Sequence, residues 1–88
     1  MSNSSNMDIR IFNISQDTTD REISKLFSSF GVVDSAGVNR NSLNGRSLKN
    51  GHVSMPVEAQ ARQAILSLDK TILDGKVISV SEKPSEFY

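Results

Sequence analysis

The chain of 88 residues is long enough for one small domain, and it contains no cysteine. This excludes disulfide bonds and thiol chemistry, and a single histidine leaves no plausible set of zinc ligands. No apolar run approaches the roughly 20 residues that a membrane span requires, and segment 1–8 lacks the apolar core of a secretory signal. We therefore expect a soluble cytoplasmic protein that binds no metal, cofactor or membrane.

Positive charge is concentrated in one stretch, although the formal net charge of the chain is zero. Between positions 35 and 57 the only charged side chains are Arg40, Arg46 and Lys49, with His52 beside them. All ten acidic residues lie outside this stretch. Nucleic-acid binders typically have a basic patch together with an overall basic charge. This chain has the basic segment without the overall basic charge.

The first half of the chain predicts a tail, a strand and a helix. The polar segment 1–6 is typical of a disordered tail. In segment 7–14, Ile9 and Ile11 alternate with Arg10 and Phe12, which indicates a strand with two distinct faces. A helix should follow, because a capping box, an apolar face at helical spacing and a glycine stop come in order. The residues of these three signals are Thr19 and Glu22, then Ile23, Leu26, Phe27 and Phe30, then Gly31.

The second half predicts three more strands and a second helix. Segments 32–40 and 51–55 have strand character and flank a polar loop with an Asn44-Gly45 turn. Segment 57–68 predicts a helix, and segment 71–82 a hairpin around Asp74-Gly75 whose second arm, from Lys76, is the fourth strand. The apolar face of the second helix comprises Val57, Ala61, Ala64, Ile65 and Leu68. Residues 84–88 form a C-terminal tail.

This order of elements predicts an α+β fold, a ferredoxin-like βαββαβ sandwich over residues 7–83. The handedness rule for split βαβ units gives a four-stranded antiparallel sheet with two helices on one face. The other face then stays open and available for binding. The expected core comprises Ile9, Ile11, Leu26, Phe27, Phe30, Val53, Ile65, Leu68, Ile78 and Val80.

Several short stretches, in order, resemble the RNA recognition motif (RRM) family over about residues 8–83. Segment 9–14 (IRIFNI) resembles the family's first-strand hexamer. Segment 48–55 (LKNGHVSM) stands where the family has its octamer, Lys/Arg-Gly-aromatic-Gly/Ala-aromatic-Val-x-aromatic, and keeps the octamer's Gly51 and Val53. Segments 27–31, 60–68 and 73–80 complete the pattern, and Met55-Pro56 is similar to short single-RRM proteins of bacteria. The resemblance implies an RRM that binds single-stranded RNA.

The departures from the family pattern fall on the expected binding face. The family stacks bases on three aromatic side chains, and these positions hold Arg10, Asn50 and His52 here. Stacking contributes about 1–3 kcal/mol per base, so the resemblance with these replacements implies weak RNA binding.

The candidate binding residues each have a functional and a structural interpretation. Phe12 is either a displaced stacking platform or a partner for the aromatic tail, Phe87-Tyr88. Flat groups at Arg10 and His52 could stack on bases, the loop cations could hold phosphates, and polar side chains of the open face could bond base edges. Every one of them could equally be ordinary solvated surface. The full set is Arg10, Phe12, Asn39, Arg40, Arg46, Lys49, Asn50, His52, Ser79 and Ser81.

Three classes of function compete at this point. RNA binding is favoured by the basic loop and by the resemblance. A protein-interaction module with little RNA affinity is favoured by the neutral net charge and the missing aromatic residues. An enzyme is not expected, because the chain has one histidine, no thiol and no phosphate-binding glycine loop.

Overall fold

In the computed structural model, which describes residues 6–83, eight elements follow one another along the chain. Their bounds are β1 (Met7–Phe12), α1 (Asp20–Ser28), β2 (Ser35–Arg40), β3 (Ser47–Met55), α2 (Glu58–Leu68), β4 (Ile72–Leu73), β5 (Lys76–Val77) and β6 (Ser79–Glu82).

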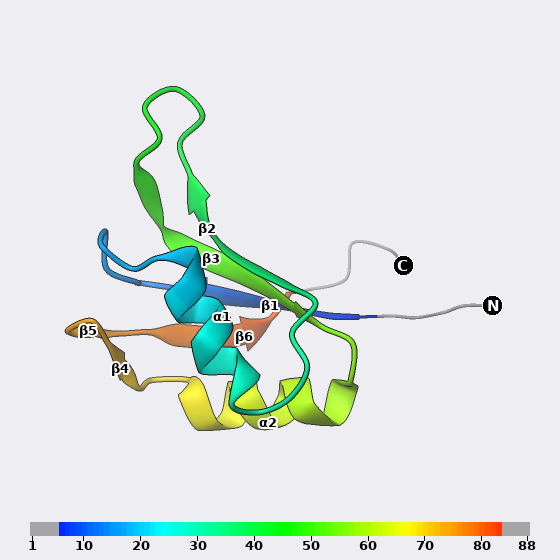
Figure 1. Ribbon diagram of the computed structural model, residues 1–88. Coiled ribbons are helices and arrows are strands. Elements are labelled where there is room, and N and C mark those ends of the chain that lie inside the picture. The colour runs from blue at the N-terminus through cyan, green and yellow to red at the C-terminus, as the bar shows by residue number, and fades with distance from the viewer. Residues whose placement is uncertain (1–5, 84–88) are drawn as a thin grey trace.

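A four-stranded sheet in the order β2-β3-β1-β6 organises the fold, and every neighbouring pair is antiparallel. Strands β4 and β5 pair only with each other. Both helices lie against the same face of the sheet, and no described element covers the opposite face (Figure 1). The predicted α+β sandwich is therefore confirmed. We call the uncovered surface the open face.

Strand β1 determines which side chains reach each face. Its exposure alternates strictly, with Met7, Ile9 and Ile11 buried and the residues between them exposed. Pairing with β3 sets Arg10 opposite His52 and Phe12 opposite Asn50. Because paired residues in antiparallel strands share a face, the replaced aromatic positions meet on the open face as predicted.

Helix α1 begins with the predicted capping box. The Thr19 backbone N–H donates to Glu22 Oε1 at 2.9 Å, and the Glu22 N–H donates to Thr19 Oγ1 at 3.2 Å. These bonds satisfy backbone donors that a helix start leaves unpaired. The helix then places Ile23 and Phe27 in the core, where both are fully buried.

The core agrees with the prediction in its centre and differs at its margins. Leu26, Phe30 and Ile65 pack against the core but are only partly buried. Val57 is 41% exposed, since it precedes α2 as the N-cap residue and does not join its apolar face. Further buried apolar side chains complete the core, namely Met7, Ile14, Ile23, Val38, Met55, Ala61 and Ala64.

Gly31 does not form the predicted left-handed helix stop. Its φ of 157° lies far from the left-handed helical value, and the C-cap of α1 is Ser29, in a right-handed conformation. A Cβ at Gly31 would overlap the side chain of Gln60, whose Oε1 accepts the Val32 N–H at 2.9 Å. Glycine at this position therefore makes room for a contact between the α1–β2 connection and α2.

The hairpin of β2 and β3 is shifted relative to the prediction. Strand β2 begins at Ser35 rather than at position 32, and β3 begins at Ser47 rather than at position 51. The register changes between the pairs Val38–Gly51 and Arg40–Ser47. One residue of β2 therefore faces three residues of β3 in an irregular bulge, which sequence alternation alone does not reveal.

Lys49 lies at the centre of this bulge with a φ of 64°, a left-handed conformation that costs a non-glycine residue about 1–2 kcal/mol. It occupies the position where the family octamer has its first glycine. We expect Lys49→Gly to raise the free energy of unfolding by about 1 kcal/mol, measured by chemical denaturation. The control Lys25→Gly, within α1, should lower it by about 1 kcal/mol. A loss of stability in Lys49→Gly would contradict the strain at this bulge.

The fourth sheet strand is shorter than predicted. Asp74 and Gly75, at φ 51° and 81°, form the predicted turn, and the paired residues Ile72 and Val77 flank it. The chain then leaves this hairpin at Ile78, whose buried side chain joins the core. Of β5 and β6, only β6 pairs with β1, so the hairpin arm and the sheet strand are two separate elements.

Asn6 corrects the predicted N-terminal boundary. Its Nδ2 donates to Asp34 Oδ2 at 2.8 Å and to Ser54 Oγ at 3.0 Å, so this residue belongs to the folded part. Segment 1–5 and the predicted tail 84–88, with Phe87 and Tyr88, lie outside the described residues.

Candidate functional site

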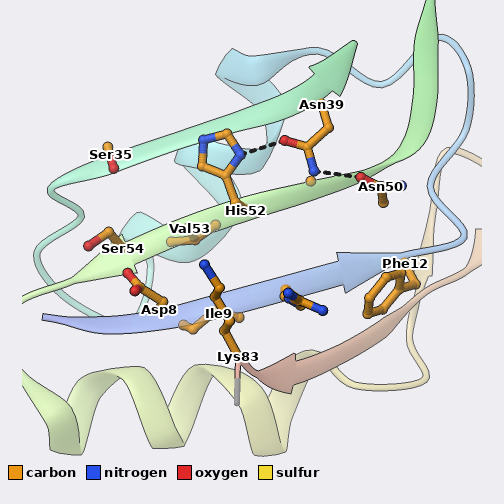
Figure 2. Close-up of a pocket in the computed structure, with 12 residues that line it drawn as sticks. Asp8, Ile9, Phe12, Ser35, Asn39, Asn50, His52, Val53, Ser54 and Lys83 are labelled. Carbon is orange, nitrogen blue, oxygen red and sulfur yellow. Dashed lines mark hydrogen bonds between the residues drawn. The ribbon is translucent and has the colours of Figure 1, made fainter. Parts of the chain in front are cut away.

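The open face contains a groove of about 610 Å³ that runs over β1, β2 and β3. Figure 2 shows the side chains of these strands around it, with Lys83 reaching in from the end of β6. The residues that line it are Asp8, Ile9, Arg10, Phe12, Ser35, Asn39, Asn50, Gly51, His52, Val53, Ser54 and Lys83.

Seven of the ten candidate binding residues share the open face. Five of them line the groove, namely Arg10, Phe12, Asn39, Asn50 and His52. Ser79 and Ser81 lie on β6, paired with Phe12 and Arg10, and extend the same face beyond the groove.

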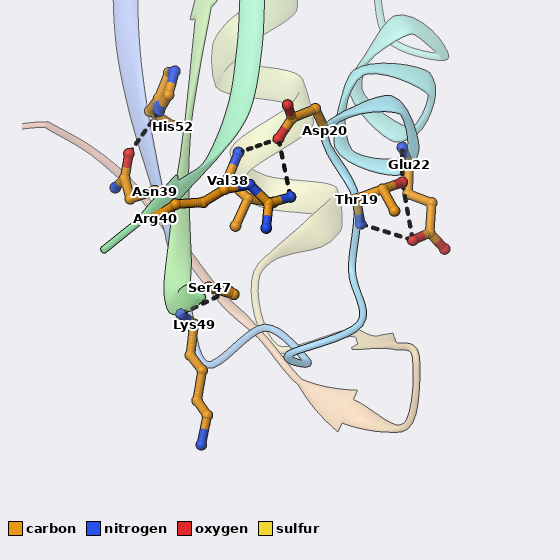
Figure 3. Close-up of polar contacts among 9 residues, drawn as sticks. All are labelled: Thr19, Asp20, Glu22, Val38, Asn39, Arg40, Ser47, Lys49 and His52. Atoms are coloured by element: carbon orange, nitrogen blue, oxygen red, sulfur yellow. Dashed lines mark hydrogen bonds and ion pairs between the residues drawn. The ribbon is translucent and has the colours of Figure 1, made fainter. Parts of the chain in front are cut away.

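The three loop cations do not converge on the groove. Arg40 alternates with Asn39 and turns to the helix side, where its Nη2 lies 4.0 Å from Asp20 Oδ1 (Figure 3). The same Asp20 oxygen accepts the Val38 N–H at 2.7 Å, so Arg40 helps to join β2 to the start of α1. Lys49 projects from the hairpin (Figure 3), and neither it nor Arg46 lines the groove. The predicted binding role of Arg40 therefore has no support from its position.

His52 has a defined position in the groove. Its Nδ1 lies 3.0 Å from Asn39 Oδ1 (Figure 2). The ring lies close to β2, as the distance to a Cβ built on Gly37 shows. Such a Cβ would stand 3.2 Å from the ring Cε1. Glycine at position 37 therefore leaves the room that the ring occupies beside β2.

The groove also contains residues that the sequence analysis did not select. Asp8 lies two residues before Arg10, Ser54 two after His52, and Lys83 two after Ser81. The period of two that identified their neighbours would have found them, and Ser35 as well. Arg10 and Lys83 bring two positive charges to the groove, against one negative charge from Asp8.

Residues 6–83 contain no cluster of metal ligands and no membrane-spanning helix. In this part of the chain, no three His, Asp or Glu side chains gather in a way that could hold a metal ion. Neither of its helices has the length and apolar character to cross a bilayer.

Comparison with known protein sequences points to one family. The RNA recognition motif profile matches residues 9–79. The chain is 40% identical over 73 residues to the 28 kDa chloroplastic ribonucleoprotein of Nicotiana sylvestris. The aligned residues make up 83% of this chain and 26% of that protein. It is 39% identical over 69 residues to glycine-rich RNA-binding protein 8 of Arabidopsis thaliana, covering 77% of the chain and 40% of that protein. The chain thus spans less than half the length of either relative.

Solved structures agree with this assignment. The crystal structure of RNA-binding protein PG1 matches with a TM-score of 0.86 and 29% identity, covering 93% of this chain and 99% of that one. The Sxl-lethal protein/RNA complex matches with a TM-score of 0.87 and 26% identity, covering 94% and 50%. The family is defined by RNA recognition rather than by catalysis, in agreement with the expectation of a non-enzyme. With its sheet order, its open face and these similarities, the chain belongs to the RNA recognition motif family.

Proposed function

We propose that this chain binds single-stranded RNA through the groove on its open face. The observation that carries the proposal is that Phe12, His52 and Arg10 meet in one groove on the face that no described element covers. Flat side chains on an exposed sheet are the groups on which single-stranded bases stack. The relatives named as ribonucleoproteins and RNA-binding proteins, and the matched complex with RNA, support the same ligand.

Each part of the groove has a matching part of the ligand. Phe12, 41% exposed, offers a ring to one base, and His52 offers a smaller ring to another. Arg10 and Lys83 can hold phosphates or, in the case of the guanidinium, stack on a base. Asn39 and Asn50 supply amide groups. Because only two ring side chains, Phe12 and His52, line the groove, we expect micromolar or weaker affinity, with phosphate contacts contributing a large share.

The salt dependence of binding tests a further contribution from the hairpin cations Arg46 and Lys49, which lie outside the groove. We expect Arg46→Ala and Lys49→Ala each to weaken all RNA sequences alike, by about two- to fivefold, because phosphate contacts do not distinguish bases. Each variant should reduce the slope of log affinity against log salt concentration by about 0.7 per lost contact. Fluorescence anisotropy with short RNA at several salt concentrations measures both quantities.

Lys25→Ala is the matched control, because Lys25 is exposed on α1, on the helix side of the sheet. It should leave both affinity and slope nearly unchanged. Tight binding that is insensitive to the two hairpin substitutions would rule out a contribution from the hairpin cations.

A protein-interaction module is the alternative prediction from the sequence. NMR titration with short random RNA pools separates the two functions. RNA binding in the groove shifts the backbone amides of β1 and β3, including those of Arg10 and His52. If RNA leaves the open face unchanged, the RNA proposal fails and the alternative stands.

Two finer predictions accompany the proposal. The similarity of Met55-Pro56 to short bacterial members supports a bacterial single-RRM type, whereas the relatives named above come from plants. A cytoplasmic location is the expectation from the composition, and imaging of the tagged protein in its own cell would test it.

A further inference from the structure

Three polar side chains and one backbone carbonyl form a chain of hydrogen bonds across β2 and β3. The Asn50 Nδ2 donates to the Leu48 carbonyl at 3.2 Å. The Asn39 Nδ2 donates to Asn50 Oδ1, and Asn39 Oδ1 faces His52 Nδ1 at 3.0 Å. Figure 2 shows the two bonds on either side of Asn39, which lie along the edge of the groove. We call these residues the amide relay.

The direction of the amide relay is fixed at its Leu48 end. A backbone carbonyl can only accept, so Asn50 must turn its NH₂ group to Leu48 and its Oδ1 to Asn39. Asn39 must then donate to Asn50, which leaves its own Oδ1 as the atom facing His52. Since that oxygen only accepts, Nδ1 of His52 carries the proton in this bond.

We propose that the amide relay makes His52 a specificity-determining residue by holding its neutral ring in the Nδ1–H tautomer, so that Nε2 presents a hydrogen-bond acceptor to the ligand. The hydrogen bond of one ring nitrogen determines the role of the other. Within residues 6–83 no hydrogen bond occupies Nε2. This inference rests on the proposed function and adds the chemical identity of the group that His52 reads.

Gly37 leaves room for the ring in this position. A Cβ on Gly37 would lie 3.2 Å from Cε1 and 3.4 Å from Nε2 of His52, tighter than an ordinary contact. The ring thus rests beside the β2 backbone while Asn39 holds its other nitrogen. The bond to Asn39 holds the ring in the space that Gly37 leaves open, and such preorganisation favours a selective contact.

The fixed tautomer selects a class of ligand group. A lone pair on Nε2 accepts N–H donors, which bases present on their Watson–Crick edges as amino or imino groups. The same lone pair repels phosphate oxygens and base carbonyl oxygens. The neutral His52 ring therefore contacts a base edge, whereas Arg10 and Lys83 contact the phosphates.

The tautomer can be measured in the free protein, without any RNA. Long-range ¹H–¹⁵N NMR spectra at a pH where the ring is neutral should show a protonated Nδ1 and an unprotonated Nε2. Asn39→Ala removes the acceptor, and Asn50→Ala removes the group that fixes the orientation of Asn39. Both variants should shift the ring toward the Nε2–H tautomer, which neutral histidine prefers in water.

Asn50→Ala is the more informative variant, because Asn50 makes no bond to His52. If the Asn39–His52 contact alone set the tautomer, the loss of Asn50 would leave the tautomer unchanged. Ser35→Ala is the matched control, on the same face of β2 and in the same groove but outside the relay. It should leave the tautomer unchanged. An Nε2–H ring in the parent, or an unchanged Nδ1–H ring in both Asn39→Ala and Asn50→Ala, would overturn the proposal.

A second measurement tests the ligand group. Tetranucleotides of uridine, cytidine and adenosine are each compared with a counterpart whose Watson–Crick N–H is methylated, such as N3-methyluridine. At least one methylated counterpart should bind the parent about three- to tenfold more weakly, the effect of one lost hydrogen bond. Asn39→Ala should reduce this discrimination.

The outcomes separate the two proposals. Equal binding of every methylated and unmethylated pair would overturn the base-edge assignment while leaving RNA binding intact. If no oligonucleotide binds, the proposed function fails and this ligand with it, whereas the tautomer of the free protein is decided independently by NMR.

Discussion

Replacing Phe27 with alanine is expected to lower the free energy of unfolding by about 3–5 kcal/mol. Phe27 is fully buried between α1 and the sheet and is the largest of the completely buried side chains. Its removal takes away transfer free energy and leaves a cavity that the surrounding core only partly fills. A small domain lies near the low end of the usual range of about 5–15 kcal/mol, so the variant should lose most of its stability.

Phe12→Ala provides a matched control for the same chemical change. Phe12 is 41% exposed on the open face, so its loss should cost about 1 kcal/mol or less. Urea denaturation followed by circular dichroism measures both variants. A Phe27→Ala protein with the same urea midpoint as the parent would show that this side chain does not support the core.

Restoring an aromatic side chain at position 10 is expected to tighten RNA binding about tenfold. Arg10 lies at the family's first-strand aromatic position and is paired with His52 across the sheet. A tyrosine there adds a stacking platform, which contributes about 1–3 kcal/mol per base, and the loss of one positive charge offsets part of this gain. Because Arg10 points away from the core, Arg10→Tyr should change the stability little.

The control for this gain is Arg62→Tyr, which makes the same substitution on the exposed side of α2. Arg62 pairs there with Glu58 at 2.7 Å, a contact that raises the pKa of the guanidinium above its ordinary value. It lies outside the groove and should not tighten binding. Fluorescence anisotropy compares the two variants at equal salt concentration. If Arg10→Tyr binds no better than Arg62→Tyr, stacking is not what limits the affinity of this groove.

The amide relay gives position 52 a hydrogen-bonding role in addition to stacking. His52 occupies an aromatic position of the octamer but carries two ring nitrogens, one of which is held by Asn39. A phenylalanine at position 52 would keep a ring for stacking and lose the acceptor. If the groove binds RNA as proposed, we expect substitutions of Arg10 on β1 to change the affinity and substitutions of Asn39 on β2 to change the base preference.

Local sequence signals determined the order of elements and the composition of the open face. The capping box of Thr19 and Glu22 needs only residues three apart, and the turn at Asp74-Gly75 needs only adjacent residues. The alternation of Ile9 and Ile11 with Arg10 and Phe12 likewise repeats every two residues along one strand. Such patterns are visible in the sequence because the physical interaction and the residues that make it lie close together in the chain.

Tertiary structure decided the features that depend on two strands at once. The register between β2 and β3, which pairs Gly37 with His52 and Val38 with Gly51, brings Asn39 beside Asn50 and His52. Alternation within β2 predicts that Asn39 and Arg40 point to opposite faces, but only the packing of α1 against β2 brings Asp20 to Arg40. The sequence by itself thus determined the fold and the side chains of its open face, whereas the pairing of β2 with β3 decided which of them bond to one another.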